Sequence, residues 1–469
     1  MDTSLVKKIV KKTKLIIKDN SNANKIMDIL KYTQCKNIQV ICLACKSLAE
    51  IFSHYISTKA ILNTSKITAA EEDLSKEDQF STWLKEQFGT TCDVLCEFLS
   101  HKNVEVQESS LAAIVTLLQS LFECNCDDIS GHLIGNLITQ LLSEDEDRSA
   151  IINCLPSDVS HWEKGTKFSS ACLTHIKNQI KHNNELHTNV FLFNCWRLIK
   201  KVASYNMDNS TSRQLTGVIC NFLSYKIPTE LYRDILTGIS PIMEKMSTPQ
   251  RLTDFLSHSF DIGGAISLMS LHGLFILMHK HNLDYPDFYN KLYSMFEPQV
   301  FSAKYKARFF HLADTFLSST HLPSYLVAAF VKRLARLSLH APASAVYIII
   351  PFIFNLINRH PALNVMLGRS DGPTELDSDP YMPDEKDPCK CNALESCLWE
   401  LQVLERHYDP DLSLKASKRK TETETDLSTL LEATSTDIIG AYGKKIKKDN
   451  VPINFMKIGG LYLSDGFVL

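Results

Sequence analysis

The chain has 469 residues, of which 44% are hydrophobic and 22% are charged, and its formal net charge is −3. This length suits two or three ordinary domains or one long repeat array, and the composition is that of a folded protein. The small net charge excludes a global attraction to nucleic acid, so any such contact would need a local basic patch. The 16 glycines are few for folds that depend on tight turns and phosphate-binding loops.

An internal repeat opens the chain. KNIQVICLACKSLAEIF (36–52) and KNVEVQESSLAAIVTLL (102–118) align without gaps at an offset of 66 residues. Each has an early asparagine, whose side chain can accept from the free N–H groups of a helix start, followed by apolar residues at helical spacing. HEAT-like repeats stack helix pairs in this way. The alternative is a chance likeness of two amphipathic helices, and the polar segment 57–80 between them is interpreted as an insertion or long loop.

Helical periodicity continues along the chain, without a convincing strand pattern. We predict helices over 129–144, 167–182, 186–206, 212–225 and 229–246, one or two helices over 255–278, and further helices over 285–296, 303–318, 323–339, 343–358 and 392–407. The predicted fold class is therefore all-α, a HEAT/armadillo-like α-solenoid of stacked helix pairs. We predict a helical-repeat region over 1–250, a second helical domain over 251–413, and a flexible basic linker and tail over 414–469.

Two later segments are not expected to form helices. DGPTELDSDPYMPDEKDP (371–388) holds seven acidic residues and four prolines, which predicts an exposed acidic loop. The chain ends in the apolar stretch INFMKIGGLYLSDGFVL, whose last 15 residues are interpreted as a docking peptide.

Most of the 14 cysteines lie in apolar helical patterns, where a free thiol acts as a small hydrophobe. The lysine-rich N-terminus does not have the apolar core of a signal peptide, so we expect a reducing compartment. Cys42 and Cys45 have metal-like spacing without a matching second pair, which favours packing within a helix. We therefore predict no metal site and no cofactor.

Two segments could suggest a membrane protein. Residues 262–279 and 337–358 contain no Asp, Glu, Lys or Arg, and each is long enough for a span. Histidines interrupt both, prolines also interrupt the second, and its strongly apolar part is only about 13 residues long, closer to a buried core helix. Buried helices are the favoured interpretation, and a multi-pass protein of the nuclear membrane is the alternative.

The sequence lacks the usual nucleotide-binding, zinc-protease and serine-hydrolase motifs, which argues against an enzyme. His311 and Asp314 stand three residues apart and could pair on a helix, but such pairs are common surface contacts.

A binding surface is instead predicted in residues 308–342. A helix beginning near Pro323 would bury Leu326, Phe330, Leu334 and Leu337, with cations on the opposite side. Residues 300–370 hold eight Lys or Arg and one acid, a one-signed pattern that suits an anionic partner. The acidic loop 371–388 could shield this face until the partner binds. The predicted partner-binding residues are Arg308, His311, Thr315, His321, Tyr325, Lys332, Arg333 and Arg336.

The binding-surface residues lie in segments that resemble a known protein family. The segments 283–298, 309–342 (FFHLADTFLSSTHLPSYLVAAFVKRLARLSLHAP) and 395–412 (ESCLWELQVLERHYDPDL) resemble the CCAAT-binding-factor-type domain of nucleolar complex proteins, and look most like the nucleolar complex protein 4 family. The resemblance implies a non-enzymatic helical scaffold in the nucleus and nucleolus. It also implies a role in pre-rRNA processing within the small-subunit processome, in complex with a nucleolar protein 14-type partner and without a small-molecule substrate.

The resemblance leaves several points open. It does not show whether the protein contacts pre-rRNA directly. The six lysines between residues 7 and 18 could touch RNA phosphate or form a solvated helix face. A DNA-binding transcriptional regulator is the alternative that the domain's name suggests, although the sequence shows no recognition-helix module or zinc finger.

Nuclear import is predicted to use two basic clusters, KASKRK (415–420) and KKIKK (444–448). Short lysine runs also occur by chance, and a partner could carry the protein into the nucleus. The residues of the two clusters are Lys415, Lys418, Arg419, Lys420, Lys444, Lys445, Lys447 and Lys448.

Overall fold

The computed structural model describes residues 3–61, 76–156, 165–182, 188–368, 378–418, 424–432, 436–437 and 440. Over these ranges all regular structure is α-helix or 3-10 helix and there is no strand, so the prediction of an all-α fold is confirmed. Two compact units are present, Met1–Asp284 (unit 1) and Tyr285–Leu469 (unit 2). The predicted boundary after residue 250 lies inside unit 1, and the three-region division stays a prediction. Most of the predicted insertion 57–80 lies outside the described residues.

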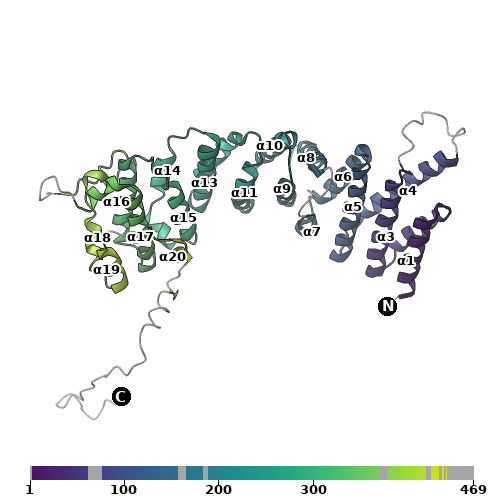
Figure 1. Ribbon diagram of the computed structural model, residues 1–469, viewed down its shortest axis with the longest axis horizontal. Helices are drawn as coiled ribbons and strands as arrows, with labels where there is room; N and C mark the ends of the chain where they lie inside the picture. The colour runs from purple at the N-terminus through teal and green to yellow at the C-terminus, as the bar shows by residue number, and fades with distance from the viewer. Residues whose placement is uncertain are drawn as a thin grey trace, which may run out of the picture. The chain divides into compact units, whose positions relative to one another are not determined.

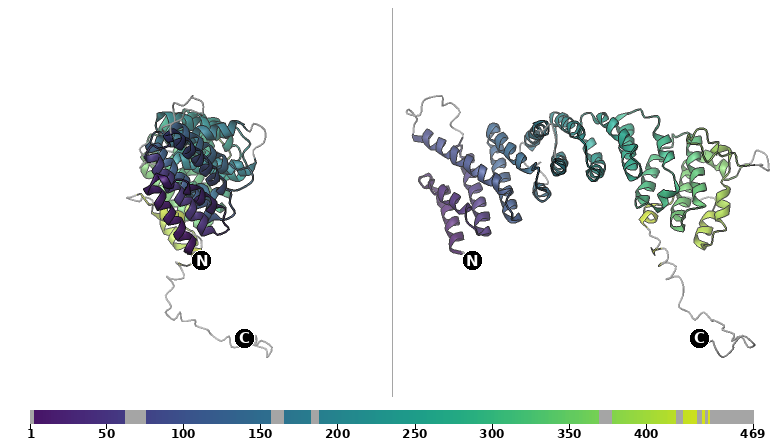
Figure 2. Two further views of the ribbon diagram at one scale, coloured as in Figure 1. Left: turned by 90° about the vertical axis from the view of Figure 1, so that its right-hand side faces the viewer. Right: turned by 180° about the vertical axis from the view of Figure 1, so that it is seen from behind.

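Unit 1 is built from helices that pack on close neighbours in the chain. One series of contacts joins α3 to α5, α5 to α7, α7 to α9, α9 to α11 and α11 to α13, and another joins α4 to α6, α6 to α8 and α8 to α10. Figure 1 shows this succession from the purple α1 to the teal α13, and the right-hand view of Figure 2 shows the same helices from behind. The helices are α1 (Thr3–Lys18), α2 (Lys25–Thr33), α3 (Ile38–Ser57), α4 (Lys76–Phe98), α5 (Val104–Glu123), α6 (Asp127–Leu141), α7 (Ser149–Cys154), α8 (Gly165–His182), α9 (Asn189–Ser204), α10 (Asn209–Leu223), α11 (Thr229–Met243), α12 (Thr253–Phe260) and α13 (Gly264–His281).

The two segments of the predicted repeat form matching helices. The side chain of Asn37 accepts from the backbone N–H of Gln39 at 3.1 Å, and that of Asn103 accepts from Glu105 at 2.8 Å. These bonds satisfy one free N–H at the start of each helix, as predicted. The helices that follow, α3 and α5, are 20 residues long each and pack against one another.

Unit 2 is built around its central helix, α16 (Ser324–Ser338), whose residues 326–332 are all buried. α16 packs against α17, η5, η6 and α18. One side of it carries an aromatic cluster, in which the ring of Phe330 lies 5.4 Å from Tyr293 and 5.3 Å from Phe296. The elements are α14 (Phe288–Ser294), η4 (Pro298–Ser302), α15 (Lys306–Phe316), α16 (Ser324–Ser338), α17 (Ala343–Arg359), η5 (Pro361–Met366), η6 (Ala393–Glu395), α18 (Trp399–Leu404), α19 (Pro410–Ser417) and α20 (Ser428–Glu432). The helix predicted over 392–407 is therefore two short helices.

Among the described helices, α3 alone is long and apolar enough to cross a membrane, and 61% of its most apolar window is buried inside the protein, as in a core helix. The two segments singled out in the sequence do not contain such a helix. α17 is apolar but has 17 residues, with Pro351 inside it. These observations do not support the nuclear-membrane alternative.

The cysteines are free thiols, and most of them are at least partly buried. Burial, with a smaller contribution from Cys42, raises the pKa of Cys45 to about 12. A thiol with so high a pKa is neutral at physiological pH, which fits the packing role expected for Cys45.

Candidate functional site

The predicted binding helix, α16, holds its central cation inside unit 2. The Lys332 side chain is 0% exposed, and its Nζ lies 2.8 Å from Glu400 Oε1 and 3.0 Å from Asp379 Oδ2. The same ammonium donates to the carbonyl oxygen of Cys397 at 2.7 Å. A buried charge is stable only when it is paired and hydrogen-bonded, and the ion pairs with the two carboxylates together with the hydrogen bond to the Cys397 carbonyl meet that condition for Lys332.

Aromatic rings complete the surroundings of this ammonium. Lys332 Nζ lies 5.5 Å from the ring centroid of Trp399 and 5.9 Å from that of Tyr381, within the range of cation–π attraction. The guanidinium of Arg336 lies 5.1 Å from the Trp399 centroid and 3.9 Å from Glu400. We call Lys332, Asp379, Trp399 and Glu400 the Lys332 cluster.

The two carboxylates of the cluster have different environments. Glu400 is 0% exposed, and burial raises its pKa although the ammonium of Lys332 opposes this effect. Burial would also raise the pKa of Asp379, but hydrogen bonds from Ser396, Trp399 and Lys332 lower it to about 2. The two acids lie on residues 378–404, so the cluster fastens this segment to α16.

Arg333 makes a second link between segments of unit 2. Its Nε donates to the carbonyl oxygen of Phe296 at 2.8 Å, and its guanidinium lies 4.5 Å from the ring centroid of Tyr293. The hydroxyls of Tyr293 and Tyr381 are 2.9 Å apart and share a hydrogen bond. Arg333 therefore joins the loop after α14 to α16, and the tyrosine pair joins α14 to the loop that contains Tyr381.

The prediction that Lys332 lies on an exposed face, available to a partner, is wrong. The helical wheel predicted that α16 buries only the side that carries Leu326, Phe330, Leu334 and Leu337. Val327, Val331 and Ala335 lie outside that side and are also 0% exposed. The reason is that residues 378–404 cover the second side of the helix with their own acids. Asp379 of the loop 371–388 pairs with Lys332, residues 371–377 lie outside the described residues, and the shielding of this face from a partner stays a prediction.

The other predicted partner-binding residues lie nearer to solvent. His311, Thr315, His321 and Tyr325 are exposed, and Arg308 is partly exposed. Their role in partner binding stays a prediction, as it does for the partly exposed Arg333 and Arg336.

The considered pairing of His311 with Asp314 is replaced by a different contact. Asp314 Oδ1 accepts from Arg359 Nη1 at 2.7 Å, and Arg359 also binds Glu424 at 3.0 Å. This chain of charges ties α15, the end of α17 and the start of the α20 region together. The aspartate thus has a structural partner from another helix.

Only two residues of the predicted import clusters lie in the described part of the chain. Lys418 is exposed, while Lys415 is partly buried with its Nζ 4.8 Å from the ring centroid of Tyr347. The remaining six, Arg419, Lys420, Lys444, Lys445, Lys447 and Lys448, lie outside the described residues, as does the C-terminal apolar stretch.

Sequence reasoning missed three members of the cluster, Asp379, Trp399 and Glu400. A signal was present for one of them, because Glu400 stands alone as an acid among apolar residues in CLWELQVL. If such an acid is buried, it needs a cation or hydrogen-bond donors as its partners. The sequence contains no comparable indication of which cation that would be.

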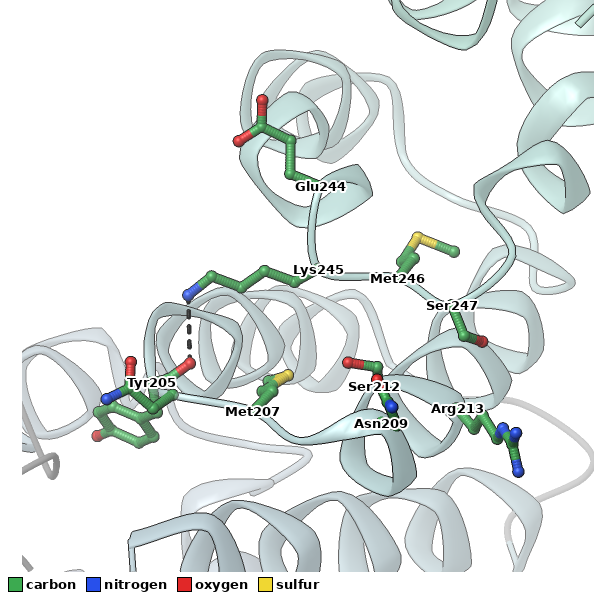
Figure 3. A pocket seen from close by; sticks show the side chains of 10 residues that line it. Tyr205, Met207, Asn209, Ser212, Arg213, Glu244, Lys245, Met246 and Ser247 are labelled. Atoms are coloured by element: carbon green, nitrogen blue, oxygen red, sulfur yellow. Dashed lines mark hydrogen bonds between the residues drawn. The ribbon is translucent and has the colours of Figure 1, made fainter. Parts of the chain in front are cut away.

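Unit 1 contains a cavity of about 540 Å³ beside the loops that follow α9 and α11. Figure 3 shows Lys245 reaching across it, and its Nζ donates to the carbonyl oxygens of Ser204 at 3.0 Å and Tyr205 at 3.2 Å. A lysine in this position satisfies the last carbonyls of α9, which is a helix-capping role. Burial lowers the pKa of Lys245. The cavity lining shows no nucleophile beside a base, and the described residues contain no group of three or more metal-ligating side chains.

Comparison with known proteins places this chain in a family. The CBF/Mak21 family matches residues 267–416, which include the Lys332 cluster. The chain is 36% identical to the nucleolar complex protein 4 homologue of Danio rerio over 96% of this chain and 93% of that protein. It is 35% identical to the homologue of Gallus gallus and 34% identical to that of Homo sapiens, each over 95% of this chain, covering 95% and 93% of those proteins. The chain therefore belongs to the nucleolar complex protein 4 family.

Proposed function

We propose that this protein is a non-enzymatic helical scaffold that acts in ribosome biogenesis in the nucleolus. The observation that carries the proposal is family membership along nearly the whole chain, since the relatives named nucleolar complex protein 4 match 95% or 96% of it. A likeness of this extent includes both units. The proposed role therefore belongs to the whole protein.

We further propose that the protein works in small-subunit maturation, bound to a nucleolar protein 14-type partner within the small-subunit processome. Its architecture in this proposal is an α-solenoid. Support comes from the packing of unit 1, where each helix contacts its near neighbours in the chain, as in stacked helical repeats. Such proteins offer extended surfaces for binding other macromolecules.

The polar residues of unit 2 support a scaffold rather than an enzyme. Lys332 is enclosed by acids and aromatic rings, and Asp314 is held by Arg359. A catalytic acid or base needs access to a substrate proton. These groups are instead used to join segments of the chain.

The DNA-binding alternative has less support. Lys332 is buried, and Arg333 and Arg336 contact aromatic rings of their own unit. Phosphate contacts, by contrast, need cations that can reach the nucleic acid backbone. We therefore assign Lys332 a structural role.

The proposed function is tested by rapid depletion of the protein in growing cells, followed by pulse-labelling of new rRNA. We expect small-subunit rRNA to fall while large-subunit rRNA continues to form, and an epitope-tagged copy to lie in the nucleolus. Restoring the wild-type chain should restore small-subunit rRNA. Unchanged synthesis of both rRNAs, or a loss of large-subunit rRNA alone, would contradict the proposal.

A further inference from the structure

The positive charge of the chain is concentrated at its N-terminal end. Residues 3–46 hold ten lysines and two aspartates, a formal net charge of +8, whereas the whole chain has −3. The same residues contain no arginine and no glutamate. A one-signed patch of this kind creates a local field that the net charge of the chain conceals.

The helix α1 arranges part of this charge in a line. Ile9, Thr13 and Ile16 are buried against the rest of unit 1 and define the inner side of the helix. The opposite side carries four exposed lysines at spacings of three or four residues, which we call the lysine row: Lys7, Lys11, Lys14 and Lys18. At a rise of 1.5 Å per residue the row extends over about 16 Å.

No acid balances the lysine row. α1 contains no Asp or Glu, and none of the four lysines forms an ion pair with a carboxylate of the described residues. Like charges at these spacings destabilise a helix, and an exposed helix face normally mixes both signs to avoid this effect. An anionic ligand along the row would relieve the repulsion.

The rest of unit 1 fixes the direction in which the row points. α1 packs on α2 and α3, and it lies at one end of the unit (Figure 1). A further lysine of α1 makes an internal contact: Lys12 Nζ binds Asp28 Oδ2 at 2.8 Å and lies 5.3 Å from the ring centroid of Tyr32. Lys12 thus attaches α1 to α2, while the lysine row faces solvent.

We propose that the lysine row of α1 binds the phosphate backbone of RNA without reading its sequence. A lysine ammonium is a compact charge on a flexible stem, which suits contacts to successive phosphates. Such contacts release counterions and make binding depend strongly on salt. The choice of RNA among polyanions rests on the proposed role in ribosome biogenesis.

An acidic protein segment is the other class of ligand for a basic face, and α1 lacks the features that favour it. Protein interfaces are enriched in arginine and aromatic residues and depleted in lysine. α1 contains neither an arginine nor an aromatic residue. The lysine row therefore fits a polymer of phosphates better.

The test compares full-length variants by fluorescence anisotropy with a labelled single-stranded poly(U) RNA over a range of salt concentrations. One variant replaces the row with glutamine (Lys7→Gln, Lys11→Gln, Lys14→Gln and Lys18→Gln). The matched control removes the same charge from four scattered exposed lysines (Lys102→Gln, Lys181→Gln, Lys226→Gln and Lys304→Gln). Circular dichroism melting of all three proteins verifies that the fold is retained.

We expect the row variant to bind about ten-fold or more weakly at low salt, and the control to bind within about two-fold of wild type. In the row variant the negative slope of log K against log salt should become shallower by about 3, because each of the four lost phosphate contacts contributes about 0.7 for a single strand. Equal binding by row variant and control, or no binding of RNA by the wild type, would overturn the proposal. Equally tight binding of polyglutamate through the row would assign it to an acidic protein instead.

The proposed function and this inference can fail separately. A row variant that has lost RNA binding but still lies in the nucleolus leaves the proposed function intact and confirms a distinct RNA-contact surface. A wild-type chain that binds RNA through the row but lies outside the nucleolus refutes the proposed function. In that case the lysine row still binds polyanions, but the choice of RNA as its natural ligand loses its support.

Discussion

Replacing Lys332 with methionine should destabilise unit 2 strongly, because it removes the nearest counter-charge of the buried Glu400 and leaves only the guanidinium of Arg336, 3.9 Å away. The methionine side chain would fill a similar volume and bring no charge. Glu400 is 0% exposed and would lose an ammonium at 2.8 Å, whereas Asp379 is 25% exposed and keeps its bonds from Ser396 and Trp399. Most of the loss therefore arises at Glu400.

The expected magnitude follows from removing one partner of a buried pair, which costs about 3–5 kcal/mol. Burial already raises the pKa of Glu400, so the carboxyl group can take up a proton in the variant. Protonation relieves part of the cost, which favours the lower end of the range. The same reasoning makes the loss larger at pH 8 than at pH 5, since the ionised form of Glu400 is the destabilising one.

This change can be measured in unit 2 specifically by a urea titration in which hydrogen–deuterium exchange of peptides from α16 and α18 reports the unfolding. A double variant, Lys332→Met with Glu400→Met, should recover most of the loss, because apolar side chains can replace a buried ion pair at little cost. Lys304→Met is the surface control and should change stability by no more than about 0.5 kcal/mol. If Lys332→Met behaves like this control, the reasoning about the buried cluster is wrong.

Three further changes test other contacts. Asp379 has a pKa of about 2, below its ordinary value of 3.8. Its carboxylate therefore stabilises the fold above about pH 4, and this contribution is lost as the pH falls towards 2. In acid titrations the stability difference between wild type and Asp379→Asn should shrink over the same interval. Asn37→Ala should cost about 0.5–2 kcal/mol in urea unfolding because a capping bond is lost, whereas Asn24→Ala should cost less, since Asn24 makes no side-chain capping bond. Phe330→Ala should cost about 3–5 kcal/mol, because the ring is 0% exposed and packs on two aromatic neighbours; equal stability of any variant and wild type would exclude the corresponding contact.

Local features of the fold could be predicted from the sequence because they depend on residues close together in the chain. Asn37 caps a helix whose first N–H groups lie two residues away, and the periodicity of α3 and α5 identifies their buried sides. The helix bounds after residue 127 agree with the predicted ranges within a few residues in most cases. The division of the predicted helix 392–407 was missed, since apolar spacing does not show the break at residues 396–398.

Distant contacts could not be predicted in the same way. Lys332 donates to a carbonyl 65 residues later in the chain, and Asp314 pairs with an arginine 45 residues away. A helical wheel describes one helix and cannot show that a second segment covers its polar side. The exposure expected of the candidate surface therefore holds for His311 and Thr315 on α15 and Tyr325 on α16 but not for the enclosed Lys332, while partner binding by these residues stays a prediction.

The central claim, that this protein is a nucleolar scaffold of ribosome assembly, is tested most directly by affinity purification of the tagged full-length chain from growing cells with quantitative mass spectrometry. The account predicts recovery of small-subunit precursor particles together with a nucleolar protein 14-type partner at comparable abundance. Recovery of chromatin-bound transcription factors or of large-subunit precursors, without small-subunit components, would contradict it.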